Sequence, residues 1–271
     1  MAYVLFFLKT IWYTLGVVVL CGLCVSFCRF LFEKMLGGRL GYGVVLATSI
    51  VGTPIHELGH ALMCLLFGHR ITAMKLWQPR SKDGTLGYVT HTYNRRNPYH
   101  ILGNLFIGIG PIFSGMGVLI LAVWLGFPES FGSFAASALT AAEEGHILTL
   151  LLEGITLLPR MVTELFRGET APLWLSILAI LLILAVSQHI SLSVDDIKGA
   201  LRAIPLYLLL VLILTVVCAL LGQEAMDTVM GGLALFSGYM TALFSLALAA
   251  SLVQILLAAP LWILRLLFPK R

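Results

Sequence analysis

Long apolar runs dominate the chain and are separated by short polar segments. Runs of about 20 apolar residues can cross the ~30 Å hydrocarbon core of a bilayer as α-helices. About six such runs stand out, near 4–32, 43–67, 101–125, 172–191, 203–221 and 231–257. The first run is too long for a secretory signal peptide and lacks a small-residue cleavage site, so we interpret it as a retained helix. The pattern therefore predicts a polytopic membrane protein with about six transmembrane helices.

The loop at 68–99 is long enough to form structure of its own. Two strand-like runs within 71–93 flank Ser81-Lys82-Asp83-Gly84. An Asp-Gly pair favours a tight turn because it tolerates positive φ. The sequence therefore predicts a β-hairpin in this loop.

Segment 126–171 combines apolar clusters such as ILTLLLEGITLL with acidic and basic side chains. Such a segment suits one or two helices that lie at the membrane interface, with a seventh span as the alternative. No soluble domain of ordinary size fits between the apolar runs. The predicted fold is all-α, a single membrane-embedded domain over 1–271 with about six transmembrane helices, a small β-hairpin and interfacial helices.

Composition supports the membrane assignment, and charge suggests an orientation. The chain is 59% hydrophobic and 11% charged, against roughly 45–50% and 25% in soluble domains. Basic residues gather in the 68–99 loop and near the C-terminus, at Arg70, Lys75, Arg80, Lys82, Arg95, Arg96, Arg265, Lys270 and Arg271. Short basic loops stay in the cytoplasm, so we expect the hairpin and both termini on the cytoplasmic side of a bacterial membrane. The net charge of +4 is interpreted as a topology signal, and nothing else indicates nucleic-acid binding.

The second apolar run contains His56-Glu57-Leu58-Gly59-His60, which matches H-E-x-x-H. Residues four apart lie on one helix face, so both imidazoles can bind one Zn²⁺ while the glutamate reaches a water at the open position. Zinc lowers the pKa of that water towards ~7, and the glutamate takes its proton as the water attacks a carbonyl. Two packing histidines with a stray glutamate are the alternative, but three ionisable groups in lipid cost several kcal/mol unless something pairs them. The favoured hypothesis is a zinc site with Glu57 as general base.

Thr53-Pro54 precedes this motif. Proline is favoured at the first position of a helix after a capping threonine. The span therefore either breaks near Gly52 and restarts, giving water a route to irregular backbone, or carries a simple proline kink.

Two histidines need a third protein ligand from elsewhere. The end of the fourth run offers His189, Asp195 and Asp196. The second run points inward, the third outward and the fourth inward, which brings this segment to the membrane half that holds the histidines. Ser193 is a predicted N-cap, so helix capping is the alternative use of the two aspartates. We favour Asp196 as the ligand, with Asp195 or His189 as substitutes or supporting partners.

These features together resemble the site-2 protease family of intramembrane zinc metalloproteases. His56, Glu57 and His60 match the zinc-binding motif of that family, and Gly110-Pro111 resembles its Gly-Pro-x-x-Asn element, with Ser114 in place of the asparagine. The aspartate in SVDDIKG corresponds to the family's third ligand within a divergent element. The resemblance covers about residues 43–200, which would form the metalloprotease-like core.

The resemblance implies hydrolysis of a peptide bond within or beside the bilayer, in a membrane-protein substrate. A substrate helix must be unwound first, because its carbonyls are hidden in its own hydrogen bonds. The edge of the hairpin at 85–93 could pair with the extended substrate, or the hairpin could simply cover the site. His69, His91 and His100 are interpreted as ordinary polar loop residues.

Two other function classes compete with the protease. A protease-derived scaffold would bind a partner transmembrane helix without cleaving it, but structural zinc needs no base at position 57. A metal transporter would need a pathway of further intramembrane ionisable residues, and these are scarce. Control would come from the substrate or from a regulatory membrane partner.

Overall fold

Helices make up most of the protein, as the apolar runs predict. The structure is a computed structural model that describes residues 1–81, 84–144, 147–168 and 171–267. The helices are α1 (Ala2–Ile11), α2 (Val17–Leu36), α3 (Gly38–Leu66), α4 (Pro98–Gly126), α5 (Pro128–Glu143), α6 (Ile147–Arg167), α7 (Leu173–Ser187), α8 (Val194–Leu201), α9 (Ile204–Leu221) and α10 (Gln223–Leu267). A π-helical segment, η1 (Trp12–Gly16), joins α1 to α2 in one rod.

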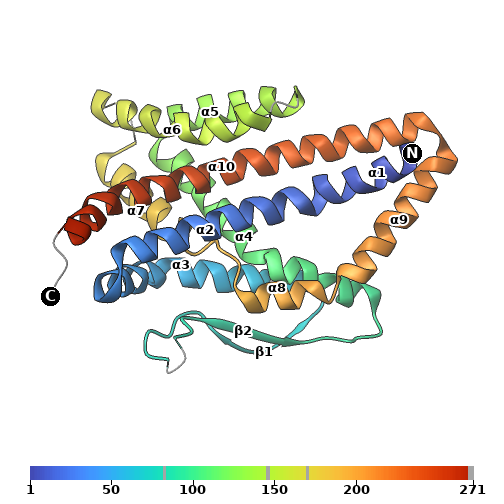
Figure 1. The fold of residues 1–271 in the computed structure, drawn as a ribbon, viewed down its shortest axis with the longest axis horizontal. Coiled ribbons are helices and arrows are strands. Elements are labelled where there is room, and N and C mark those ends of the chain that lie inside the picture. The colour runs from blue at the N-terminus through green and yellow to red at the C-terminus, as the bar shows by residue number, and fades with distance from the viewer. Residues whose placement is uncertain (82–83, 145–146, 169–170, 268–271) are drawn as a thin grey trace.

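The helices form layers around α4. Helices α1 and α2 run beside α10 along the long axis, with α5 and α6 on one side and α3 with the hairpin on the other (Figure 1). Ile112, Leu119 and Val123 of α4 have no exposed surface, nor does Phe127, which follows the helix. These four side chains form the centre of the main apolar core. Because α4 contacts α3, α7 and α8, this core fixes the elements that carry the predicted site.

Four helical segments in the described residues are long and apolar enough to cross a membrane, namely 2–36, 98–126, 204–221 and 223–267. They correspond to four of the predicted runs. The run at 43–67 forms α3, whose histidines, glutamate and threonines make it less apolar, and the run at 172–191 forms the 15-residue helix α7. At 1.5 Å per residue α7 is only ~22 Å long. These four segments support the membrane assignment, whereas the count of six spans stays a prediction.

The predicted hairpin is present as β1 (Arg70–Lys75) and β2 (Tyr88–Thr92), which pair antiparallel with an irregularity between Ile71 and Ala73. The strands are shorter than the predicted runs, and 85–87 precede β2 rather than belonging to it. The predicted turn at Ser81-Lys82-Asp83-Gly84 includes two residues, 82 and 83, that lie outside the described residues. Gly84 has a φ of 79°, the positive value that glycine permits.

Helix α3 excludes one of the two alternatives for Thr53-Pro54, a break of the second run near Gly52. The helix is continuous from Gly38 to Leu66 and contains Pro54 in its interior. Only one backbone hydrogen bond is lost at an internal proline, and packing of α3 against α4 retains the helix through this position.

Segment 126–171 forms the helices α5 and α6, which pack against each other and against α10. Helices α1–α2 and α10 run in the same direction, so the first residue and the end of α10 lie at opposite ends of the long axis (Figure 1). The predicted cytoplasmic location of both termini gains no support from this arrangement and stays a prediction.

Candidate metal centre

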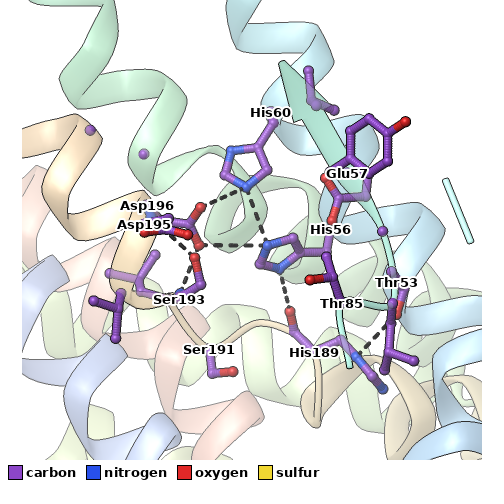
Figure 2. A pocket seen from close by; sticks show the side chains of 18 of the residues that line it. Thr53, His56, Glu57, His60, Thr85, His189, Ser191, Ser193, Asp195 and Asp196 are labelled. Carbon is purple, nitrogen blue, oxygen red and sulfur yellow. Dashed lines mark hydrogen bonds and ion pairs between the residues drawn. The ribbon is translucent and has the colours of Figure 1, made fainter. Parts of the chain in front are cut away.

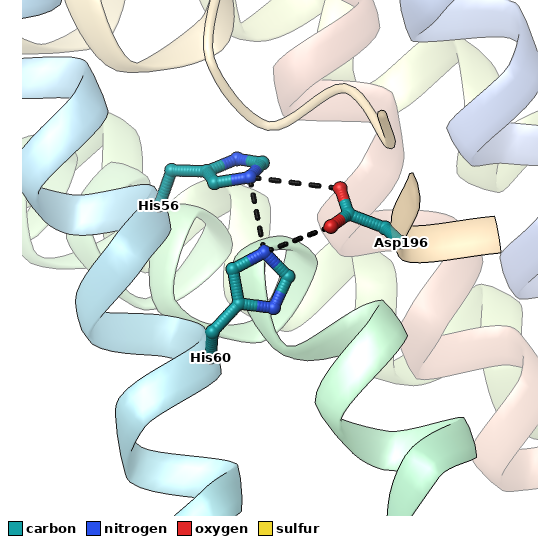
Figure 3. A group of neighbouring side chains, drawn as sticks. All are labelled: His56, His60 and Asp196. Atoms are coloured by element: carbon teal, nitrogen blue, oxygen red, sulfur yellow. Dashed lines mark hydrogen bonds and ion pairs between the residues drawn. The ribbon is translucent and has the colours of Figure 1, made fainter. Parts of the chain in front are cut away.

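The candidate metal centre begins with two histidines on one face of α3. His56 and His60 are one helical turn apart, and their Nε2 atoms lie 3.2 Å from each other. Both rings point towards Asp196 of α8 (Figure 3). The four-residue spacing thus produces the shared face that the sequence predicts.

The ring of His60 is oriented by a carbonyl group that a proline leaves free. His60 Nδ1 donates a hydrogen bond to the carbonyl oxygen of Ile107, at 2.7 Å. In a regular helix this carbonyl would accept from the N–H four residues later, but that residue is Pro111, which has no N–H. The Gly-Pro pair of α4 therefore supplies an acceptor to the histidine of the neighbouring helix.

The ring of His56 is oriented by the loop between α7 and α8. His56 Nδ1 donates to the carbonyl oxygen of His189, at 2.8 Å. The His189 ring points the other way, with Nε2 3.2 Å from Thr48 Oγ1. Gly52 lies against that ring, and any Cβ at position 52 would collide with it. Glycine at position 52 therefore allows the loop to approach α3 closely enough to hold His56.

Asp196 completes the cluster from the first turn of α8. Its Oδ1 lies 3.0 Å from His60 Nε2, and its Oδ2 lies 3.6 Å from His56 Nε2. Ser193 caps this helix, because its Oγ accepts from Asp196 N–H while Asp196 Oδ2 accepts from Ser193 N–H. From the sequence, capping and metal binding were alternatives for this aspartate. In the structure, the Asp196 carboxylate accepts the cap hydrogen bond and also lies beside both histidines.

The three side chains fit a metal cation. Each histidine donates its Nδ1–H to a carbonyl, so in the neutral tautomer each Nε2 carries a lone pair. Two lone pairs and a carboxylate then face one point, with the ligand atoms within 4.8 Å of one another. Ligands of a tetrahedral zinc, bound at about 2.0–2.2 Å, are separated by roughly 3.3–3.5 Å. A cation compensates the repulsion of such an acceptor cluster, and two imidazoles with one carboxylate are a ligand set of catalytic zinc sites.

The other two ligand candidates do not join the cluster. The Asp195 side chain is 93% exposed and pairs with Lys198 at 3.4 Å. His189 contributes its backbone carbonyl to His56 and its ring to the threonines of α3. Among the described residues, the one group of three or more metal-binding side chains is His56, His60 and Asp196.

Glu57 lies beside the cluster, in the wall of a cavity of about 1050 Å³ (Figure 2). The cavity is bounded by α2, α3, α4, α8 and the segment that leads into β2. Glu57 is only 6% exposed. A Cβ at Gly87 would meet Glu57 Cγ at 2.8 Å, so the backbone before β2 passes directly over the carboxylate.

The sequence missed several groups of this cavity. Arg29 and Glu33 of α2 form an ion pair at 2.7 Å and line it, and Arg29 Nη1 donates to Ser191 Oγ at 2.8 Å. Charged side chains within an apolar run were the sequence signal that could have identified these two residues. His91, interpreted as an ordinary loop residue, also lines the cavity.

Close contact between α3 and α4 positions the cluster and depends on two glycines. A Cβ at Gly59 would lie 2.6 Å from the carbonyl oxygen of Gly110. Ser114 donates to the carbonyl oxygen of Ile55, at 2.8 Å, on the same interface. Without side chains at the two glycines, the helices approach closely enough for His60 to reach α4.

Replacing Gly59 by alanine should therefore destabilise the protein by about 1–3 kcal/mol, because the added methyl group overpacks this contact. Thermal unfolding in detergent measures the effect. Gly43→Ala is the matched control on α3, because no described atom lies within 4 Å of a Cβ there. Equal midpoints for the two variants would show that the close contact is not needed.

Comparison of the chain with protein-family models, curated proteins and solved structures finds no match.

Proposed function

We propose that the protein is an intramembrane zinc metalloprotease that hydrolyses a peptide bond in or near the transmembrane segment of a membrane protein. The observation that carries the proposal is the convergence of His56, His60 and Asp196 beside Glu57 in one cavity. Helices α2 and α4, which line the cavity and belong to segments long and apolar enough to cross a membrane, support the substrate class together with the resemblance of the motif to site-2 proteases.

The residues of the chain divide the chemistry between them. His56, His60 and Asp196 would hold the zinc, and the carbonyls of Ile107 and His189 keep the two imidazoles in the binding tautomer. When bound, zinc supplies a Lewis acid that brings the pKa of a water molecule to ~7 and polarises the carbonyl under attack.

Glu57 acts as the general base. Its carboxylate takes a proton from the water whose oxygen attacks the carbonyl carbon. As the carbon–nitrogen bond breaks, the same proton passes to the departing nitrogen, which leaves as an amine. The other product is a carboxylic acid, whose proton then passes to the amine, so that a carboxylate and an ammonium group result. Burial of Glu57 beneath the Gly87 backbone keeps this proton transfer away from bulk water.

The hairpin is suited to present the substrate in extended form. Residues 84–91 line the cavity, and the 84–87 stretch lies outside the strand ladder. A peptide that lies along this stretch would be unwound at the point where its carbonyl meets Glu57.

A comparison of membrane-protein N-termini tests the proposal without a known substrate. Cells that produce the native chain should show new N-termini within or beside transmembrane segments. Cells that produce Glu57→Gln at the same level should lack them. The same set of N-termini in both would contradict proteolysis and favour the alternative, a scaffold that binds a transmembrane helix without cleaving it.

A further inference from the structure

Three histidines near the hairpin form a hydrogen-bonded chain that leads to the cavity. His69 follows α3, His91 lies on β2 and His100 lies at the start of α4. His69 Nε2 donates to the carbonyl oxygen of His100, at 2.7 Å, because a carbonyl can only accept. A neutral imidazole has a single N–H, so His69 Nδ1 is left as an acceptor.

This arrangement sets the tautomer of His91. His69 Nδ1 lies 2.9 Å from His91 Nδ1, and because the former is an acceptor, His91 Nδ1 must donate. The remaining nitrogen of His91, Nε2, then carries a lone pair. His69 is itself buried and stacks on Tyr93 with ring centroids 4.7 Å apart, which holds the chain of rings in place.

His91 borders the cavity from a half-buried position on β2. Along β2, Val89 and His91 are half-buried, whereas Tyr88, Thr90 and Thr92 are exposed. His91 lines the same cavity as Glu57 and the metal cluster. Within the described part of the chain, no hydrogen bond to His91 Nε2 is found, so this acceptor is available to a ligand.

The surroundings of His91 favour an uncharged hydrogen-bond donor as its partner. Burial, together with the nearby His69, His60 and Arg202, lowers the pKa of His91 to about 4. The ring therefore stays uncharged at neutral pH, and the cationic Arg202 disfavours a cationic donor such as a lysine side chain. A backbone N–H of an extended peptide is a neutral donor of the required kind.

We propose that His91 Nε2 is a substrate-binding acceptor that takes a hydrogen bond from a backbone N–H of an extended peptide in the cavity. This inference rests on the proposed function and adds a specificity to it. A proline or N-methylated residue at the matching position lacks the donor and is bound more weakly. His91 holds the peptide in register with Glu57 and takes no part in proton transfer.

Binding of peptide hydroxamates to the full zinc-loaded chain in detergent tests this directly. The probes are short alanine–leucine peptides whose terminal hydroxamate binds the metal. In a series of analogues, one backbone N–H at a time is replaced by an N-methyl group. On the native chain, one N-methyl analogue should bind about tenfold more weakly than its parent. On His91→Phe, the parent should bind about tenfold more weakly, and that analogue should bind no worse than the parent.

Two further variants separate binding from structure. His91→Gln places a carbonyl oxygen near the position of Nε2. It should therefore restore part of the N–H preference, meaning the tighter binding of the parent peptide than of its N-methyl analogue. Thr92→Val changes an exposed side chain of the same strand and should leave it intact. All variants should retain the zinc content of the native chain, and His91→Gln carries the test where His91→Phe does not fold.

The inference is overturned if each N-methyl analogue loses the same affinity, relative to its parent peptide, on the native chain, on His91→Phe and on His91→Gln. It is also overturned if no peptide binds the zinc-loaded chain. These results do not depend on turnover. Absence of any preference for the N–H peptides in the native chain, with Glu57-dependent cleavage intact, would remove the role of His91 alone. A retained preference without any cleavage would instead remove the proposed protease activity.

Discussion

Replacing Glu57 by glutamine is expected to lower the rate of substrate cleavage by about 10²–10⁴-fold while leaving the metal in place. Glutamine has nearly the same size, but its amide cannot accept the proton of the attacking water. The metal-binding cluster consists of His56, His60 and Asp196, so the substitution removes none of its members. Initial cleavage rates and zinc content of the purified chain measure the two parts of this prediction.

Glu129→Gln provides the control, because it makes the same chemical change at an exposed position of α5, remote from the cavity. Its cleavage rate should stay within about threefold of the native value, as expected for a surface substitution. A Glu57→Gln chain that cleaves at the native rate would show that another group acts as the base.

Replacing Asp196 by alanine is expected to remove zinc from the protein. The carboxylate lies within 3.6 Å of both histidine Nε2 atoms and is the one negative charge among the three ligands. Loss of an outer partner of a ligand costs roughly 10–100-fold in metal affinity, and loss of a ligand should cost more. Metal titration of the purified variant, with cleavage measured in parallel, checks both consequences.

Two matched variants distinguish metal binding from helix capping. Asp195→Ala removes the neighbouring carboxylate, which is exposed and paired with Lys198, and should keep native zinc affinity. Ser193→Ala removes the hydroxyl that accepts from Asp196 N–H but leaves the Asp196 side chain. Zinc retained by Ser193→Ala and lost by Asp196→Ala would identify ligation as the main role, whereas equal losses would assign the effect to the cap.

The parts of the site that depend on local spacing could be predicted from the sequence. His56 and His60 share a face because the helix repeat is 3.6 residues, and this holds wherever the helix lies in the fold. Asp196 was favoured only through the alternating direction of the spans. Its choice over Asp195 depends on the cap geometry of α8, where Ser193 turns one carboxylate inward and leaves the other in solvent.

Contacts between distant segments could not be predicted. The carbonyl of Ile107 reaches His60 because Pro111 frees it, and the sequence shows the proline but not which helix lies beside it. The chain from His100 through His69 to His91 joins three separate elements, so no spacing along the sequence reveals it. The continuous course of α3 through Pro54 likewise reflects packing, which outweighs the local preference for a break.

The most direct test of the account measures cleavage of one identified membrane-protein substrate by the purified chain as zinc is removed and restored. The account predicts that chelation stops cleavage, that about one zinc per chain restores it, and that Glu57→Gln with equal zinc stays inactive. Cleavage that continues in the zinc-free chain, or that is equal in Glu57→Gln, would contradict it.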